Sequence, residues 1–90
     1  FRNVTDMHFR GVRVDPVMMG VLEGMPFLRS LNLFGTNLTD EYLEPISKMK
    51  DLTLLDLGAN GALTDDGIKK LAGLKKLEFL NIFESQATDE

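Results

Sequence analysis

The 90-residue chain contains no cysteine, so it has no disulfide, no thiolate metal ligand and no cysteine nucleophile. No apolar run approaches the roughly 18–20 residues that cross a bilayer, and no basic-then-apolar signal segment is present. Lys and Arg number 10 against 14 Asp and Glu. We therefore expect no membrane contact and no nucleic-acid partner, because duplex binding depends on cations that neutralise phosphates. The compartment stays unknown, although the lack of cysteine favours the cytoplasm.

What the chain does contain is one pattern repeated. The fullest copy, residues 28–51, opens with alternating leucines, turns at Gly and Asn, and closes with apolar residues at helical spacing. Repeats start at about residues 4, 28, 52 and 77, which gives periods of 24, 24 and 25 residues. We expect residues 1–90 to be a single segment of a longer array, because natural solenoids end in polar capping repeats. Its uncapped ends would lower stability or allow self-association.

Each repeat predicts a short strand followed by a short helix. The alternating leucines indicate a strand with one buried face. Thr39, Thr64 and Thr88 precede aspartates, which suits a helix N-cap and the N-terminal end of the helix dipole. The first repeat has Asp15 and Pro16 there, an N-cap residue followed by proline at the first helical position. The spacing allows only one to two helical turns.

This order resembles the leucine-rich repeat family over essentially all of the chain. The most specific stretch is residues 63–68, LTDDGI. It is similar to the (L/I)TDxGL signature of 24-to-26-residue repeats in bacterial proteins and F-box-type substrate receptors. The resemblance implies an α/β fold, a right-handed horseshoe solenoid with a parallel sheet on the concave face and short helices on the convex face. It also implies a ladder of buried amides, which we assign to Asn37 and Asn60, with Arg13 and Gln86 in the equivalent places.

Strand alternation places three rows of side chains on the concave face, because equivalent residues of stacked strands lie side by side. Aromatic residues beside polar ones are typical of protein interfaces. The expected protein-binding residues are Asp6, His8, Arg10, Asn32, Phe34, Leu54, Asp56, Phe79, Asn81 and Phe83. We expect Phe34, Phe79 and Phe83 to be exposed, since all helices lie on the other side of the sheet.

The pattern therefore favours a non-catalytic module that binds a protein ligand on its concave sheet. Two alternatives stay open: the substrate-recognition part of a larger enzyme, such as a ubiquitin ligase or receptor kinase, and a structural spacer. His8 and Asp56 should lie two strands apart, about 10 Å, which is too far for acid–base partnership. The stretch 56–67 has glycines where a calcium loop needs carboxylates, so no cofactor or metal is expected.

Overall fold

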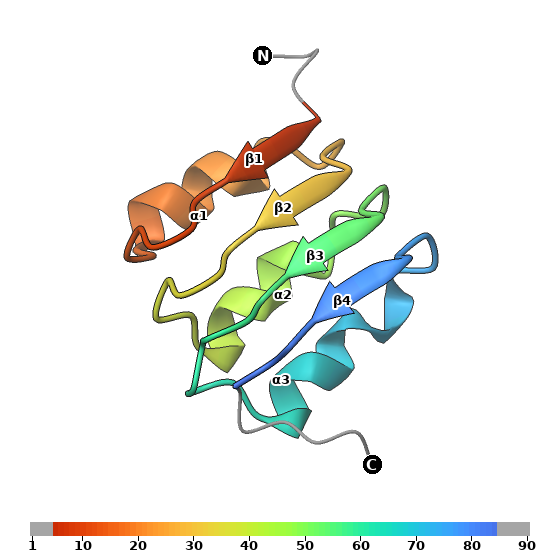
Figure 1. Cartoon of the computed structure of the whole chain (residues 1–90). Coiled ribbons are helices and arrows are strands. Elements are labelled where there is room, and N and C mark those ends of the chain that lie inside the picture. Colours follow the sequence, from red (N-terminus) through yellow and green to blue (C-terminus); the bar gives the residue numbers. More distant parts are fainter. Residues whose placement is uncertain (1–4, 85–90) are drawn as a thin grey trace.

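The computed structural model describes residues 5–84, in which a parallel sheet forms one layer and short helices form another (Figure 1). The strands lie in chain order: β1 (Asp6–His8), β2 (Ser30–Asn32), β3 (Leu54–Asp56) and β4 (Phe79–Asn81). The helices all lie on one side of the sheet: α1 (Pro16–Glu23), the 3₁₀ helix η1 (Asp40–Tyr42) leading into α2 (Leu43–Ile46), and α3 (Asp65–Lys69) leading into the 3₁₀ helix η2 (Lys70–Gly73). The predicted parallel sheet with short helices is confirmed.

The pairing of the strands follows the sequence period. Leu31 pairs with Met7 on one side and with Leu55 on the other, and Leu55 pairs with Leu80. The offsets between these partners are 24, 24 and 25 residues, the same as the period. Each repeat is therefore one coil of the stack. We number the coils 1 to 4 after the repeats that start at about residues 4, 28, 52 and 77. Coil 2 is thus residues 28–51 and coil 3 is residues 52–76. That residues 1–90 form one segment of a longer array stays a prediction.

The hydrophobic core lies between the sheet and the helices. Most of its members are leucines, joined by Val14, Ile46 and three methionines. The completely buried members come from coils 1 to 3: Leu22, Leu28, Leu31, Leu33, Leu38, Leu43, Ile46, Leu52, Leu55, Leu57 and Leu63. Coil 4 differs, because its inward residue Leu80 is 36% exposed and β4 forms an open edge of the described sheet.

The helix boundaries agree with the caps expected from sequence. Asp15 is the N-cap of α1, and its carboxylate accepts a hydrogen bond from the Met18 N–H at 2.8 Å. Pro16 occupies the first helical position, where its missing N–H costs nothing. Pro45 limits α2 to four residues. The N-cap predicted at Thr88 lies outside the described residues.

The buried amide of the stack comes from Asn60, which is 1% exposed. Its Oδ1 accepts hydrogen bonds from the backbone N–H groups of Thr36 at 3.0 Å and Leu38 at 2.9 Å. Its Nδ2 donates to the carbonyls of Leu33 at 2.8 Å and Leu57 at 3.0 Å. One side chain thus satisfies backbone groups of two coils that would otherwise be buried and unpaired.

The assignment of Asn37 to the same ladder is wrong. Asn37 is exposed and adopts a left-handed backbone conformation, with φ 59°. The residue one coil before Asn60 is Thr36, which is fully buried and donates its hydroxyl hydrogen to the Leu33 carbonyl at 2.9 Å. The extra residue of coil 3 therefore follows Asn60 and does not precede it. For the same reason Arg13, one coil before Asn37, does not hold a ladder position.

We predict that Asn60→Ala destabilises the fold far more than Asn37→Ala. Removal of the Asn60 amide leaves the N–H groups of Thr36 and Leu38 buried without partners, at a cost of about 1–3 kcal/mol per group. Chemical denaturation of the two variants measures the difference, and equal midpoints would contradict it.

A second polar contact joins the helical sides of coils 2 and 3. The carboxylate of Asp40 accepts a hydrogen bond from the Thr64 N–H at 2.9 Å and another from the Thr64 hydroxyl. These two bonds hold the pKa of Asp40 below its ordinary value of 3.8, and the bond from the hydroxyl has the larger effect. Thr39 and Thr64 are N-cap residues as predicted, but neither side chain caps its own helix. Asp40 of the preceding coil instead binds the N-cap residue of α3, Thr64.

The Asp40 contact explains the glycine of the LTDDGI stretch. A Cβ atom at Gly67 would lie 2.5 Å from Asp40 Cγ, so only glycine leaves room for the carboxylate. Coil 2 shows the complementary case. Tyr42 occupies the position of Gly67 there, and the coil before it has Pro16 in the position of Asp40. The small residue is present where a neighbouring carboxylate needs the space.

We predict that Gly67→Ala destabilises the protein, although alanine normally stabilises a helix by about 1 kcal/mol relative to glycine. Gly20 is the matched control, since it lies in α1 with no heavy atom within 4 Å of the added Cβ. Gly20→Ala should raise the unfolding free energy and Gly67→Ala should lower it, as measured by urea denaturation. In an Asp40→Ala background the penalty of Gly67→Ala should shrink, because the carboxylate is gone and only the Cβ of residue 40, 2.9 Å from the added atom, remains. An unchanged penalty would refute the steric account.

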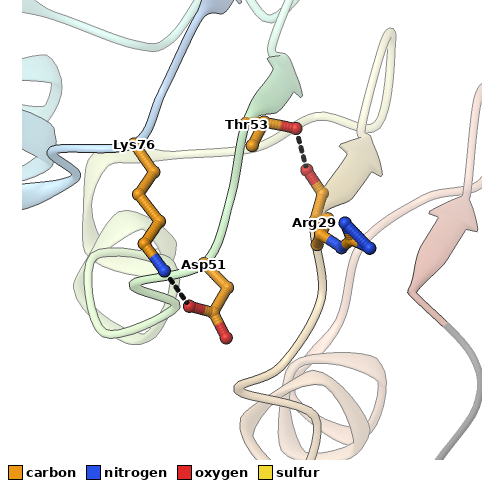
Figure 2. A network of polar contacts seen from close by, with 4 residues as sticks. All are labelled: Arg29, Asp51, Thr53 and Lys76. Atoms are coloured by element: carbon orange, nitrogen blue, oxygen red, sulfur yellow. Dashed lines mark hydrogen bonds and ion pairs between the residues drawn. The ribbon is translucent and has the colours of Figure 1, made fainter.

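Further contacts between coils lie in the turns that lead into the strands (Figure 2). The Thr53 hydroxyl donates to the Arg29 carbonyl at 3.1 Å, and Lys76 forms an ion pair with Asp51 at 3.0 Å. The ion pair is solvent-exposed, with Lys76 and Asp51 side chains 65% and 47% accessible, so it contributes about 0–1 kcal/mol. The buried amide and the Asp40 carboxylate matter more for the stacking.

Candidate functional site

The side of the sheet opposite the helices carries the residues predicted to bind a ligand. We call this side the open face (Figure 1). The strand register places equivalent residues in rows across it. The first row is Asp6, Ser30, Leu54 and Phe79, and the second is His8, Asn32, Asp56 and Asn81. The register thus aligns these residues as the sequence predicted.

The third row continues just beyond the strand ends. Backbone hydrogen bonds of 2.8–2.9 Å run from Gly11 to Phe34, from Gly35 to Gly58 and from Ala59 to Phe83. These bonds extend the parallel ladder by one position. They align Arg10 with Phe34, Phe34 with Gly58, and Gly58 with Phe83. The third row is therefore Arg10, Phe34, Gly58 and Phe83.

Phe34 is not a free aromatic ring, contrary to expectation. It is half-buried, and the guanidinium carbon of Arg10 lies 4.1 Å from the centre of its ring. On the other side the ring leans over Gly58, where an added Cβ would lie 2.8 Å from Phe34 Cδ2. Arg10 of the same row therefore covers Phe34, although the helices lie on the other side of the sheet. Arg10 is likewise engaged with that ring.

Phe79 and Phe83 are the exposed aromatic residues of the open face, at 51% and 69% exposure. Both belong to coil 4, and Leu54 beside Phe79 is half-buried. Exposed apolar surface with polar residues around it is a mark of interaction sites when it is contiguous. The strongest candidate part of the open face is thus the β3–β4 half, and binding by the full set of predicted residues stays a prediction.

The polar row is held in place by a repeated hydrogen-bond pattern. Asn32, Asp56 and Asn81 each use Oδ1 to accept the backbone N–H two residues further on, at 2.9–3.0 Å. Asn81 Nδ2 also donates to Asp56 Oδ1 at 3.0 Å. These side chains have fixed orientations, so a ligand would meet a preorganised row and would not have to order it.

His8 and Asp56 lie on β1 and β3, with Asn32 of β2 between them. The two side chains are therefore about 10 Å apart by strand spacing, beyond hydrogen-bond reach.

Within residues 5–84 no group of three or more His, Cys, Asp or Glu side chains is arranged to hold a metal ion. No helix in that range has the length and apolar character to cross a membrane.

A family model described as "Leucine Rich repeat" matches residues 24–47 and 48–72, more than half of the chain. The chain belongs to the leucine-rich repeat family. The repeat of this family thus accounts for the coil described above, in which leucines fill the core and the sheet displays rows of side chains.

A comparison with known proteins also gives a match. The chain is 29% identical over 87 residues to a Caenorhabditis elegans protein named "Putative RNA-binding protein EEED8.10". That match covers 90% of this chain and 12% of the relative. No solved structure gives a significant match.

Gly58 is the residue of the open face whose role sequence analysis missed. Its lack of a side chain makes room for Phe34 and for the Asn81 amide. The available signal was a glycine in a row that otherwise carries Arg10 and two phenylalanines. Such a gap allows a neighbouring ring to lie flat along the sheet.

We predict that Gly58→Ala destabilises this leucine-rich repeat by about 1–3 kcal/mol, the usual cost of overpacking. The added Cβ would lie 2.7 Å from Asn81 Nδ2 and 2.8 Å from Phe34 Cδ2. Gly61→Ala is the control, since its nearest neighbour would be 3.9 Å away. Denaturation midpoints that rank the two variants equally would contradict this close packing.

Proposed function

We propose that this leucine-rich repeat segment is a non-catalytic module that binds a protein ligand on its open face. The observation that carries the proposal is the exposure of Phe79 and Phe83 beside a preorganised polar row. An exposed aromatic pair next to fixed hydrogen-bonding groups is the usual composition of an interface centre with its polar surround.

We also infer that the coils follow a right-handed path with the open face on the concave side. Strand–helix–strand connections in a parallel sheet are right-handed in about 98% of cases. A concave sheet would bring the rows of β1 to β4 towards one ligand.

The proposal predicts that Phe79→Ser/Phe83→Ser abolishes ligand binding and leaves the fold intact. Both rings are more than half exposed, so their loss should shift the denaturation midpoint little. The control is Lys69→Ser/Lys75→Ser, which changes two exposed residues outside the strands. Proteins retained by the wild type on an affinity matrix after nuclease treatment should be retained by the lysine variant and lost by the phenylalanine variant. Unfolding of the phenylalanine variant, or unchanged retention, would refute the proposal.

RNA binding is a second candidate, favoured by the name of the Caenorhabditis elegans relative. The arginines in coils 1 and 2 that would serve it are Arg10, Arg13 and Arg29, all exposed. The net charge of −4 and the Asp6 and Asp56 carboxylates on the open face oppose it. Nuclease treatment in the same experiment separates the candidates, because retention that depends on RNA would be lost.

A further inference from the structure

We propose that the β3–β4 half of the open face binds an arginine side chain of the protein ligand. Its guanidinium would stack on Phe83 and donate hydrogen bonds to Asp56. The inference rests on the proposed function, since it names the ligand chemistry of the same face.

The third row already contains one guanidinium stacked on a phenylalanine. Arg10 of coil 1 covers Phe34 of coil 2 at 4.1 Å. Phe83 lies two coils further along the same row, where the neighbouring residue is Gly58 and the Phe83 side chain is 69% exposed. Phe83 is thus the described ring of this row that a cation from outside can reach. A guanidinium is suited to an aromatic face because its plane can lie parallel to the ring.

Asp56 provides the charge that selects a cation. Its Oδ1 accepts hydrogen bonds from Gly58 N–H and Asn81 Nδ2, both at 3.0 Å. Its Oδ2 accepts no hydrogen bond from the described residues. The carboxylate is half-buried and fixed by these two bonds, so it offers one free oxygen in a constant position. Charge-assisted hydrogen bonds to such an oxygen are stronger than those between neutral groups.

The two groups lie close enough to act on one side chain. Asp56 aligns with Asn81, and Phe83 follows two residues after Asn81 on the same face. Strand spacing and rise place the Cα atoms of Asp56 and Phe83 about 8 Å apart. The Asn81 amide bonds to Asp56 and lies next to Gly58, so the guanidinium would approach from the open side of the sheet. From there its plane can present a face to the ring and its N–H edge to the carboxylate. A lysine ammonium is a point charge and satisfies only one of these contacts well.

The surrounding charges favour a cation and disfavour a phosphate. Glu84 directly follows Phe83. Every lysine among the described residues lies in a helix or in a turn that leads into a strand: Lys48, Lys50, Lys69, Lys70, Lys75 and Lys76. Phe83 lies beyond the other end of β4, so Lys75 and Lys76 do not neutralise this patch. Charge complementarity therefore points to an arginine-bearing peptide and not to RNA.

The experiment is a titration of the ¹⁵N-labelled protein, followed by amide NMR shifts, with Nα-acetyl-arginine methylamide as the probe. The matching citrulline compound, which is neutral and nearly isosteric, is the ligand control. The shifts should centre on the N–H groups of Gly58 and Phe83, which bond to Asp56 and Asn81. Asp56→Asn keeps an acceptor for both existing bonds and should weaken binding about tenfold, the value of one charge-assisted hydrogen bond. Asp51→Asn, in an exposed turn, should bind as the wild type does.

Phe83→Ser should also weaken binding of the arginine probe. This second variant tests the proposal if Asp56→Asn does not give the spectrum of a folded protein. Equal binding of the citrulline compound, equal effects of Asp56→Asn and Asp51→Asn, or the same shifts on addition of oligouridylate would overturn the proposal. If no arginine binds while Phe79→Ser/Phe83→Ser still loses the protein ligand, the arginine site is wrong and the proposed function stands. If that double variant keeps its ligand, the proposed function itself fails.

Discussion

The stack depends most on the side-chain amide of Asn60. A turn that leaves a parallel sheet and enters a helix points backbone N–H and C=O groups into the interior, where they must find partners. Asn60 supplies partners to the preceding coil, at Thr36 and Leu38 through Oδ1 and at Leu33 through Nδ2, and to its own coil at Leu57. Because these bonds join Asn60 to particular residues of coil 2, the amide holds coils 2 and 3 in the register that the leucine pattern also requires. The rows on the open face follow from that register.

The period and the alternation of leucine were sufficient to predict the strands, their order and their pairing. A shift of one residue would move Leu55 from the core to the open face, so the hydrophobic pattern leaves a single register. The helix starts were predictable for a similar reason, since Asp15 and Pro16 carry local signals that depend on no other coil. All of these features are determined by residues within a single repeat.

The parts that could not be predicted depend on contacts between coils. Asn37 and Asn60 look alike in sequence, and only the position of the extra residue decides that Asn37 faces solvent while Thr36 is buried. The sequence predicted Phe34 to be exposed, but two features of neighbouring coils bury it in part. Arg10, 24 residues earlier, covers its ring, and Gly58 of the next coil leaves room for the ring to pack. The contact of Asp40 with Gly67 is a relation of the same kind, in which coil 3 carries a glycine where the side chain of the preceding coil needs space.

The central claim is that the buried Asn60 amide fixes the register of coils 2 and 3. That register aligns the side chains in rows on the open face. Hydrogen exchange at three consecutive amides tests it most directly. The N–H groups of Thr36 and Leu38 both donate to Asn60 Oδ1, and Asn37 between them is exposed. The structure predicts slow exchange at Thr36 and Leu38, fast exchange at Asn37, and loss of the contrast in Asn60→Ala. Fast exchange at all three amides of the wild-type protein would contradict the account.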